Sequence, residues 1–187
     1  WPPDFGNNLL AMNWTADTAN IIRADISDDK CDLPSYWSLS SNFDPDTMTL
    51  LMNWKMFKTP VDIQRKITFG EKSIKVKVRL RFTGDVKVRN MFEQLPFVKK
   101  SDVTIEFDNA GKWQDKPCKT AAVRFRNQAG SGVLYKFKKP HDMSFGPDSK
   151  ATWDKSQVNG VIRIHLGGVF KKNKLARVQY VIIPVKP

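Results

Sequence analysis

The segment Ile74-Lys75-Val76-Lys77-Val78-Arg79-Leu80-Arg81-Phe82 decides the fold, because it alternates without a break between an apolar side chain and a cation. Successive side chains on a β-strand point to opposite faces of the sheet, so the five apolar residues share one face and the four cations share the other. The pattern predicts a strand with one buried and one solvent-facing side. Cations two positions apart on such a strand lie about 6.5 to 7 Å from one another, a spacing that suits the phosphates of an extended nucleic-acid strand.

The same alternation of cation and apolar residue recurs later in the chain. It pairs Arg124 and Arg126, Lys136 and Lys138, Arg163 and His165, and Arg177 and Gln179 with apolar neighbours. If these strands lie side by side, their cations form a basic field on one face of a sheet. An ordinary solvated face explains one such strand equally well, since lysine and arginine also discourage edge pairing. Several such strands with hardly an acid among them favour a binding surface.

The net charge of +12 supports this interpretation, because a surplus of that size implies a polyanionic partner: nucleic acid, an acidic membrane surface or an acidic protein. The charge is unevenly placed. Residues 1–60 carry a net charge of −4 and residues 61–187 a net charge of +16. We therefore expect the binding surface in the last two thirds of the chain.

The remaining patterns predict a single domain over residues 1–187 that combines strands with one helix. An irregular arm of residues 1–18 precedes the strands, and a polar loop or insertion covers residues 139–159. Strand signals occur at 21–26, 36–42, 48–57, 74–82, 103–107, 121–126, 133–138, 161–166 and 177–185, with 59–71 as a link and a Gly-rich hairpin turn at 127–132. After a cap at Thr83 or Asp85, the residues Val88, Met91, Phe92 and Leu95 have helical spacing up to Pro96.

Motifs for catalysis are missing from the sequence. His141 and His165 are the only histidines, and neither has the neighbours of a catalytic triad. The aspartates of the first third do not have the spacing of a calcium loop, and Cys31 and Cys118 do not form a metal-ligand pair, which favours free thiols over a long-range disulfide. No apolar stretch reaches the roughly 18 to 20 residues of a membrane span. We expect a binding protein rather than an enzyme, with no metal, cofactor, membrane or small-molecule substrate.

The tryptophans divide into two groups. Trp37 and Trp54 lie in predicted strands of the acidic first third and are expected in the core. Trp113 and Trp153 lie in polar turns beside lysines, and they are candidates for stacking on bases, although either could pack against a partner subunit.

Three segments resemble the Whirly family of single-stranded-nucleic-acid-binding proteins. They are Leu80-Arg81-Phe82-Thr83-Gly84-Asp85-Val86, then residues 119–132 with their Gly-Ser-Gly hairpin, and Tyr180-Val181-Ile182-Ile183-Pro184-Val185-Lys186. Their order resembles the family's fourth strand running into its first helix, its later hairpin and its final strand. The plant members' Lys-Gly-Lys-Ala-Ala-Leu signature is absent. The chain therefore looks more like the guide-RNA-binding proteins of kinetoplastid mitochondria, with the second of the two subunits preferred.

This resemblance implies an α+β, Whirly-like fold of two packed antiparallel sheets, each of about four strands, with a helix after the fourth strand and a truncated or absent second helix. It further implies a heterotetramer with a related subunit, in the mitochondrial matrix after removal of a transit peptide. Guide RNA and pre-mRNA would be annealed on the basic face during RNA editing. The expected phosphate contacts are Lys75, Lys77, Arg79, Arg81, Arg124, Arg126, Lys136, Lys138 and Arg163.

Three alternatives remain open from the sequence. One is a viral capsid or matrix-type β-sandwich whose basic face meets a genome or acidic lipid. Another is a plant-like Whirly protein that binds single-stranded DNA. The last is an interaction subunit that docks an acidic protein.

Overall fold

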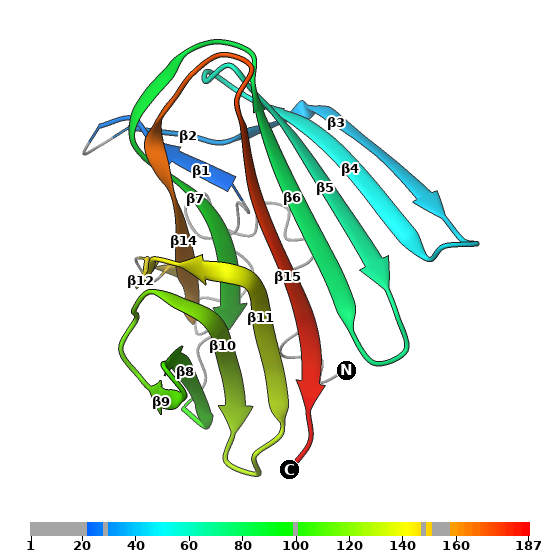
Figure 1. Ribbon diagram of the computed structural model, residues 1–187, viewed down its shortest axis with the longest axis vertical. Coiled ribbons are helices and arrows are strands. Elements are labelled where there is room, and N and C mark those ends of the chain that lie inside the picture. Colours follow the sequence, from blue (N-terminus) through cyan, green and yellow to red (C-terminus); the bar gives the residue numbers. More distant parts are fainter. Residues whose placement is uncertain (1–21, 28–29, 99–100, 147–148, 151–157) are drawn as a thin grey trace.

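The chain folds into two antiparallel β-sheets, seen in a computed structural model that describes residues 22–27, 30–98, 101–146, 149–150 and 158–187 (Figure 1). The larger sheet has nine strands, in the order β3 (Pro34–Asp44), β4 (Thr49–Met56), β5 (Val61–Phe69), β6 (Ile74–Phe82), β15 (Leu175–Val185), β11 (Gly132–His141), β10 (Thr120–Asn127), β8 (Val103–Asn109) and β9 (Lys112–Gln114). The smaller sheet has the order β12 (Met143–Phe145), β14 (Val158–Phe170), β7 (Val86–Val98), β1 (Ile22–Asp25) and β2 (Cys31–Asp32), and β13 (Ser149–Lys150) also pairs with β14.

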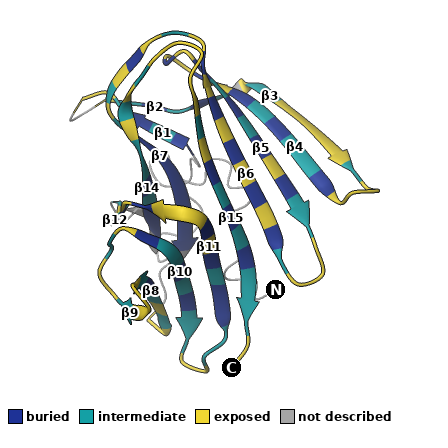
Figure 2. Cartoon of the chain, in the orientation of Figure 1, coloured by how far each residue is buried: buried dark blue, intermediate teal, exposed yellow. Residues whose placement is uncertain are grey.

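The segment 74–82 is strand β6, an interior strand of the larger sheet between β5 and β15, and its predicted alternation is confirmed. Ile74, Val76, Val78, Leu80 and Phe82 are buried, whereas the four cations between them are exposed. Figure 2 shows this as alternating dark and light bands along β6. The apolar face of β6 packs toward the smaller sheet and belongs to one continuous core cluster. The other eight predicted strands also overlap observed strands.

The α+β class and the helix after the fourth strand are wrong, because the described residues contain no helix and residues 86–98 form strand β7. This strand lies between β14 and β1, and residues 91–97 are all buried. A strand that is covered on both faces loses the alternation of apolar and polar residues, so helical spacing of its apolar residues can arise by chance. Pro96 lies opposite Val161 of β14 but beyond the residues that pair with β1, where a missing N–H is tolerated.

The predicted link at 59–71 contains strand β5, which pairs with β6 over its whole length and with β4 from Asp62 to Thr68. Its inward face holds Val61, Ile63 and Ile67, with Arg65 between them. Arg65 interrupts the apolar positions of this strand, so the alternation is not obvious in the sequence. Charged residues are almost never fully buried unless they are paired.

Arg65 is paired, within the core, by residues from both sheets. Its Nη1 donates to Oε1 of Glu93 on β7 at 2.8 Å, and its Nη2 donates to the hydroxyl of Tyr180 on β15 at 2.6 Å. That hydroxyl donates in turn to Glu93 Oε1 at 3.1 Å. Burial raises the pKa of Glu93, and the adjacent Arg65 cation opposes that rise. This inter-sheet cluster of Arg65, Glu93 and Tyr180 ties the larger sheet to the smaller one.

Several smaller expectations can be compared with the structure. The hairpin at 127–132 is confirmed: Asn127 N–H donates to the Ser131 carbonyl at 2.9 Å, and Gly130 has a φ of 83°. The expected loop at 139–159 contains β12, β13 and the start of β14. The arm at 1–18 lies outside the described residues. Cys31 and Cys118 are free thiols. No helix of the described part is long and apolar enough to span a membrane.

Candidate functional site

The outer face of the larger sheet carries a basic face that we define by Lys66, Lys75, Lys77, Arg79, Arg81, Lys136 and Arg177. All seven side chains are exposed. They share one side of the sheet because they alternate with core residues and lie in register: Lys66 is opposite Lys77, and Arg79 is opposite Arg177. Lys136 joins them through Val181, which is opposite both Lys136 and Lys75. Within the described ranges, none of the seven forms an ion pair.

Two pairs of like charges on this face repel each other. Lys66 and Lys77 are direct cross-strand partners, as are Arg79 and Arg177. Like charges placed directly opposite each other destabilise a sheet. An anion bound between the members of either pair would offset this repulsion.

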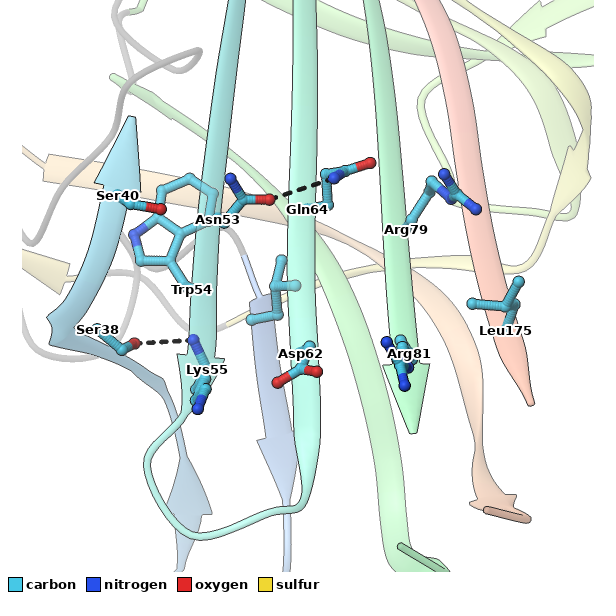
Figure 3. Close-up of a pocket in the computed structure, with 11 residues that line it drawn as sticks. Ser38, Ser40, Asn53, Trp54, Lys55, Asp62, Gln64, Arg79, Arg81 and Leu175 are labelled. Carbon is cyan, nitrogen blue, oxygen red and sulfur yellow. Dashed lines mark hydrogen bonds between the residues drawn. The ribbon is translucent and has the colours of Figure 1, made fainter. Parts of the chain in front are cut away.

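A groove of about 470 Å³ opens beside these cations on the same face of the sheet. Figure 3 shows its side chains, which come from β3, β4, β5, β6 and β15. They are Ser38, Ser40, Asn53, Trp54, Lys55, Asp62, Ile63, Gln64, Arg79, Arg81 and Leu175. Gln64 Nε2 donates to Asn53 Oδ1 at 3.2 Å across the floor. The groove therefore combines neutral donors and acceptors with three cations and one carboxylate. The carboxylate, Asp62, is the cross-strand neighbour of both Lys55 and Arg81.

A bulge in the edge strand β3 builds one wall of this groove. The pairing between β3 and β4 shifts register between Ser35 and Ser40, and the hydroxyl of Ser38 accepts the Lys55 N–H at 2.8 Å within the interruption. Trp37 lies in the same bulge and is 98% exposed, so its predicted core position is wrong. Within the bulge the register with β4 is interrupted, so the alternation of the flanking residues does not determine which way Trp37 points. Trp54 is buried, as predicted.

Arg124 and Arg126 belong to the same outer face but differ from the seven cations because they share one carboxylate partner, which offsets one of their two charges. Both donate to Glu106 on β8, with Nε–Oε2 distances of 2.8 Å for Arg124 and 3.1 Å for Arg126. These hydrogen bonds lower the pKa of Glu106, and the bond from Arg124 has the larger effect. Arg124 also lies 4.0 Å over the ring of Trp113. Trp113, a candidate for base stacking, is thereby covered by an arginine.

The other predicted contacts are scattered. Lys138 is exposed on β11, two residues beyond Lys136. Arg163 lies on β14 of the smaller sheet, where its Nε donates to Gln94 Oε1 at 3.2 Å. It is therefore separate from the basic face. Trp153 falls outside the described residues.

The two histidines differ in their contacts. His141 Nε2 is buried without a hydrogen-bond partner, whereas the ring of His165 is held by polar neighbours. The His165 ring lies 2.7 Å from Asn90 Nδ2 and 2.8 Å from Ser144 Oγ. Burial lowers the pKa of His141 and of His165. The described residues contain no cluster of His, Cys, Asp or Glu that could hold a metal ion. Asp32, one of the aspartates of the first third, accepts the backbone N–H groups of Lys58 and Thr59.

Comparison with known proteins identifies the fold. No protein-family model matches the chain, and no curated protein matches it by sequence. Solved structures do match. A heparan sulfate lyase mutant from Pedobacter heparinus aligns with 80% of this chain at a TM-score of 0.54 and 13% identity, and a chondroitinase AC lyase with 97% at a TM-score of 0.53 and 14% identity. The fold is a β-sandwich shared with carbohydrate-active enzymes. A putative aldose 1-epimerase from Escherichia coli aligns with 87% of the chain at a TM-score of 0.54 and 6% identity.

The extent of these matches limits what they show. This chain spans 22% of the heparan sulfate lyase and 28% of the chondroitinase, although it spans 78% of the putative epimerase. At such low identities the likeness establishes the architecture alone.

The resemblance to the Whirly family is overturned by this comparison, which found no Whirly or RNA-binding family. Residues 86–98 form a strand instead of the helix on which the resemblance partly depended, and the two sheets of the described residues have nine and six strands rather than about four each. The assignment to RNA editing fails with the family. The implied partner subunit and mitochondrial location lose their basis, and no observation tests them.

Most cations of the basic face are among the contacts predicted from the sequence, whereas several residues of the groove are not. Lys66 was hidden in the supposed link, and Asn53 and Gln64 were not singled out. The signal for β5 was present in the alternation of Val61, Ile63 and Ile67. Nothing in the sequence marks the bulge that raises Ser38 and Ser40.

Proposed function

We propose that this chain is a binding module for an acidic polysaccharide, which lies along the groove and across the basic face of the larger sheet. The observation that carries the proposal is the set of seven exposed cations that share one face and form no ion pair within the described residues. A face of this kind attracts a polyanion over a long range and is not needed for the fold. The proposed role is binding and includes no covalent step.

The groove supports a polysaccharide in particular. Sugar hydroxyls both donate and accept hydrogen bonds, so they require a surface that offers both. Asn53 and Gln64 present amide donors and acceptors, and Ser40 presents a hydroxyl. Arg79 and Arg81 line the same groove and can meet carboxylate or sulfate groups on the same chain.

The structural neighbours add to this proposal. The heparan sulfate lyase and the chondroitinase are named for acidic polysaccharides, and each contains a β-sandwich like this one. The basic face is an independent reason to expect an acidic ligand.

The test is a titration of the protein with heparan sulfate, with a neutral polysaccharide such as dextran, and with single-stranded RNA as competitor, at several salt concentrations. We expect binding to heparan sulfate that weakens steeply with salt, no binding to dextran, and weaker competition by RNA. Lys77→Glu reverses a charge at the centre of the basic face and should abolish binding at moderate salt. Lys112→Glu on the edge strand β9 is the matched control and should bind as the parent does.

The proposal fails if heparan sulfate does not bind, or if Lys77→Glu and Lys112→Glu weaken binding equally. It also fails if RNA binds more tightly than the polysaccharide. Capture of an acidic protein in place of any polysaccharide would support the docking alternative instead.

A further inference from the structure

Arg79 and Arg177 form the most concentrated pair of guanidinium groups on the basic face. They are direct cross-strand partners on β6 and β15, so their backbones lie about 5 Å apart. Both side chains are exposed, and neither has a carboxylate within ion-pair distance in the part of the chain that the structure describes. Figure 3 shows Arg79 reaching from β6 toward β15, the strand that carries Arg177.

The pair lies at the junction of two hollows. Arg79 lines the groove of about 470 Å³, and Arg177 lines a second hollow of about 450 Å³ together with Lys139 and His141. Leu175 lines both hollows, which places them side by side at the start of β15. A sugar chain that runs from one hollow into the other would pass directly over the two arginines.

We infer that Arg79 and Arg177 together bind one sulfate ester group of the polysaccharide, and that this site selects sulfated chains over chains that carry only carboxylates. The inference rests on the proposed function. The charge geometry points to this class of group. A guanidinium presents its donors as a planar fork that matches two acceptor oxygens at a time.

The shape of the anion decides between sulfate and carboxylate. A carboxylate is planar and has two oxygens, so it presents one edge that is suited to one fork. A sulfate ester has three terminal oxygens arranged around a tetrahedral centre, and two of its edges can each receive a fork. Two forks that converge from neighbouring strands therefore fit a sulfate ester better than a carboxylate.

A second anionic group is met by the lysine pair. Lys66 and Lys77 are opposite each other on β5 and β6, on the other side of β6 from Arg177. From the strand spacing and the rise of two residues, the centres of the two pairs are about 8 Å apart, measured obliquely across β6. Lysine donates as a point charge without a preferred plane, so this second position accepts either a carboxylate or a sulfate.

The experiment compares chondroitin sulfate with unsulfated chondroitin, which has the same backbone and keeps its carboxylates. Calorimetric titrations are made with the parent protein, with Arg79→Gln, with Arg177→Gln, and with the double variant Arg79→Lys/Arg177→Lys. We expect the parent to bind chondroitin sulfate more tightly than chondroitin. Each glutamine variant should lose about tenfold in affinity for the sulfated chain, as expected for a charge-assisted hydrogen bond, and much less for the unsulfated one.

The lysine double variant separates charge from fork geometry. It keeps both positive charges, so it should retain its affinity for chondroitin and lose most of its preference for chondroitin sulfate. Arg126→Gln is the matched control: it removes one arginine charge from the same face, but that arginine is already paired with Glu106. It should leave the preference unchanged.

Thermal unfolding gives a second readout that a purely structural role would not produce. Because the two arginines repel each other, Arg177→Gln should leave the melting temperature of the free protein unchanged or raise it, and should reduce the rise that chondroitin sulfate causes. A lower melting temperature of the free variant would assign the pair to the fold and overturn the inference.

The two proposals fail in different ways. Equal binding of chondroitin and chondroitin sulfate by the parent would overturn the sulfate site and leave the proposed function standing. No binding of either chain would overturn both. A preference for sulfate that survives Arg79→Lys/Arg177→Lys would also refute the site, because the preference would then come from charge alone.

Discussion

Replacement of Glu93 by glutamine should be among the most destabilising single changes in this protein. Glu93 is fully buried and is the only acid that the structure places against the fully buried Arg65 among the described residues. Loss of its charge leaves a cation in the core without a counterion, and breaking a buried pair in this way costs about 3 to 5 kcal/mol. Arg65 Nε and Glu93 Oε2 already have no hydrogen-bond partner, so we expect a value near the lower end of this range.

The matched variant removes the whole pair. Arg65→Met/Glu93→Leu replaces both charges by apolar groups of similar size, and such replacements of buried ion pairs are often neutral or stabilising. Tyr180→Phe is intermediate: it removes the hydroxyl that accepts from Arg65, and an unpaired buried donor costs about 1 to 3 kcal/mol.

Urea unfolding measures these effects as free energies of unfolding, provided that the slope with urea is the same for all variants. For a chain of this size, 3 to 5 kcal/mol corresponds to a fall in melting temperature of about 6 to 20 °C. If Glu93→Gln costs less than about 1 kcal/mol, or if the double variant is as unstable as the single one, the reasoning about an uncompensated buried charge is refuted.

Three further predictions concern other parts of the fold. Burial, and to a smaller degree the charge of Lys139, lowers the pKa of His141. The free energy of unfolding should therefore fall as the pH drops below about 6.5, the ordinary pKa of histidine. In urea unfolding, His141→Asn should flatten this part of the pH profile, and an unchanged profile would exclude His141 as its source. A Cβ at Gly168 would lie 2.3 Å from the Val88 carbonyl oxygen, so Gly168→Ala should destabilise by about 1 to 3 kcal/mol in the same assay, and a neutral result would show that the two strands can move apart. Trp37→Ala should leave the melting temperature within about a degree of the parent, because a fully exposed side chain stabilises little. The same variant should weaken polysaccharide binding if the indole packs on a sugar ring. A large fall in melting temperature would show instead that Trp37 supports the fold.

A strand with one solvent-facing side can be predicted from its sequence more easily than a strand that is buried on both sides. Strand β6 was predicted correctly because one of its faces meets water, and the contrast between core and solvent appears directly as alternation. Strand β7 has no such contrast over residues 91–97, where neighbours cover both of its faces. Its apolar residues then fit the spacing of a helix, and only the pairing with β1 and β14 identifies a strand.

The candidate site shows the same limit. The exposed cations of β6 could be predicted from the sequence, as could the general idea of a basic face. The ion pairs of Arg124 and Arg126 with Glu106 could not be predicted, because Glu106 lies on β8 and meets them only through the pairing of β8 with β10. The placement of Arg163 depends on which of the two sheets contains β14. Local alternation gives the face of a residue within its own strand, but sheet membership is decided by contacts between distant segments.

The bulge in β3 reduces the tendency of the edge of the larger sheet to pair with a strand of another molecule. β3 is an outer strand of the nine-stranded sheet, and an uninterrupted outer strand offers unpaired N–H and C=O groups to which a strand of another molecule can add. Between Ser35 and Ser40 the backbone leaves the regular ladder. The bulge divides the edge into two short pieces, each less than the six or seven residues typical of segments that nucleate fibrils. Restoring a regular strand by deletion within the bulge would therefore be expected to produce a protein that aggregates.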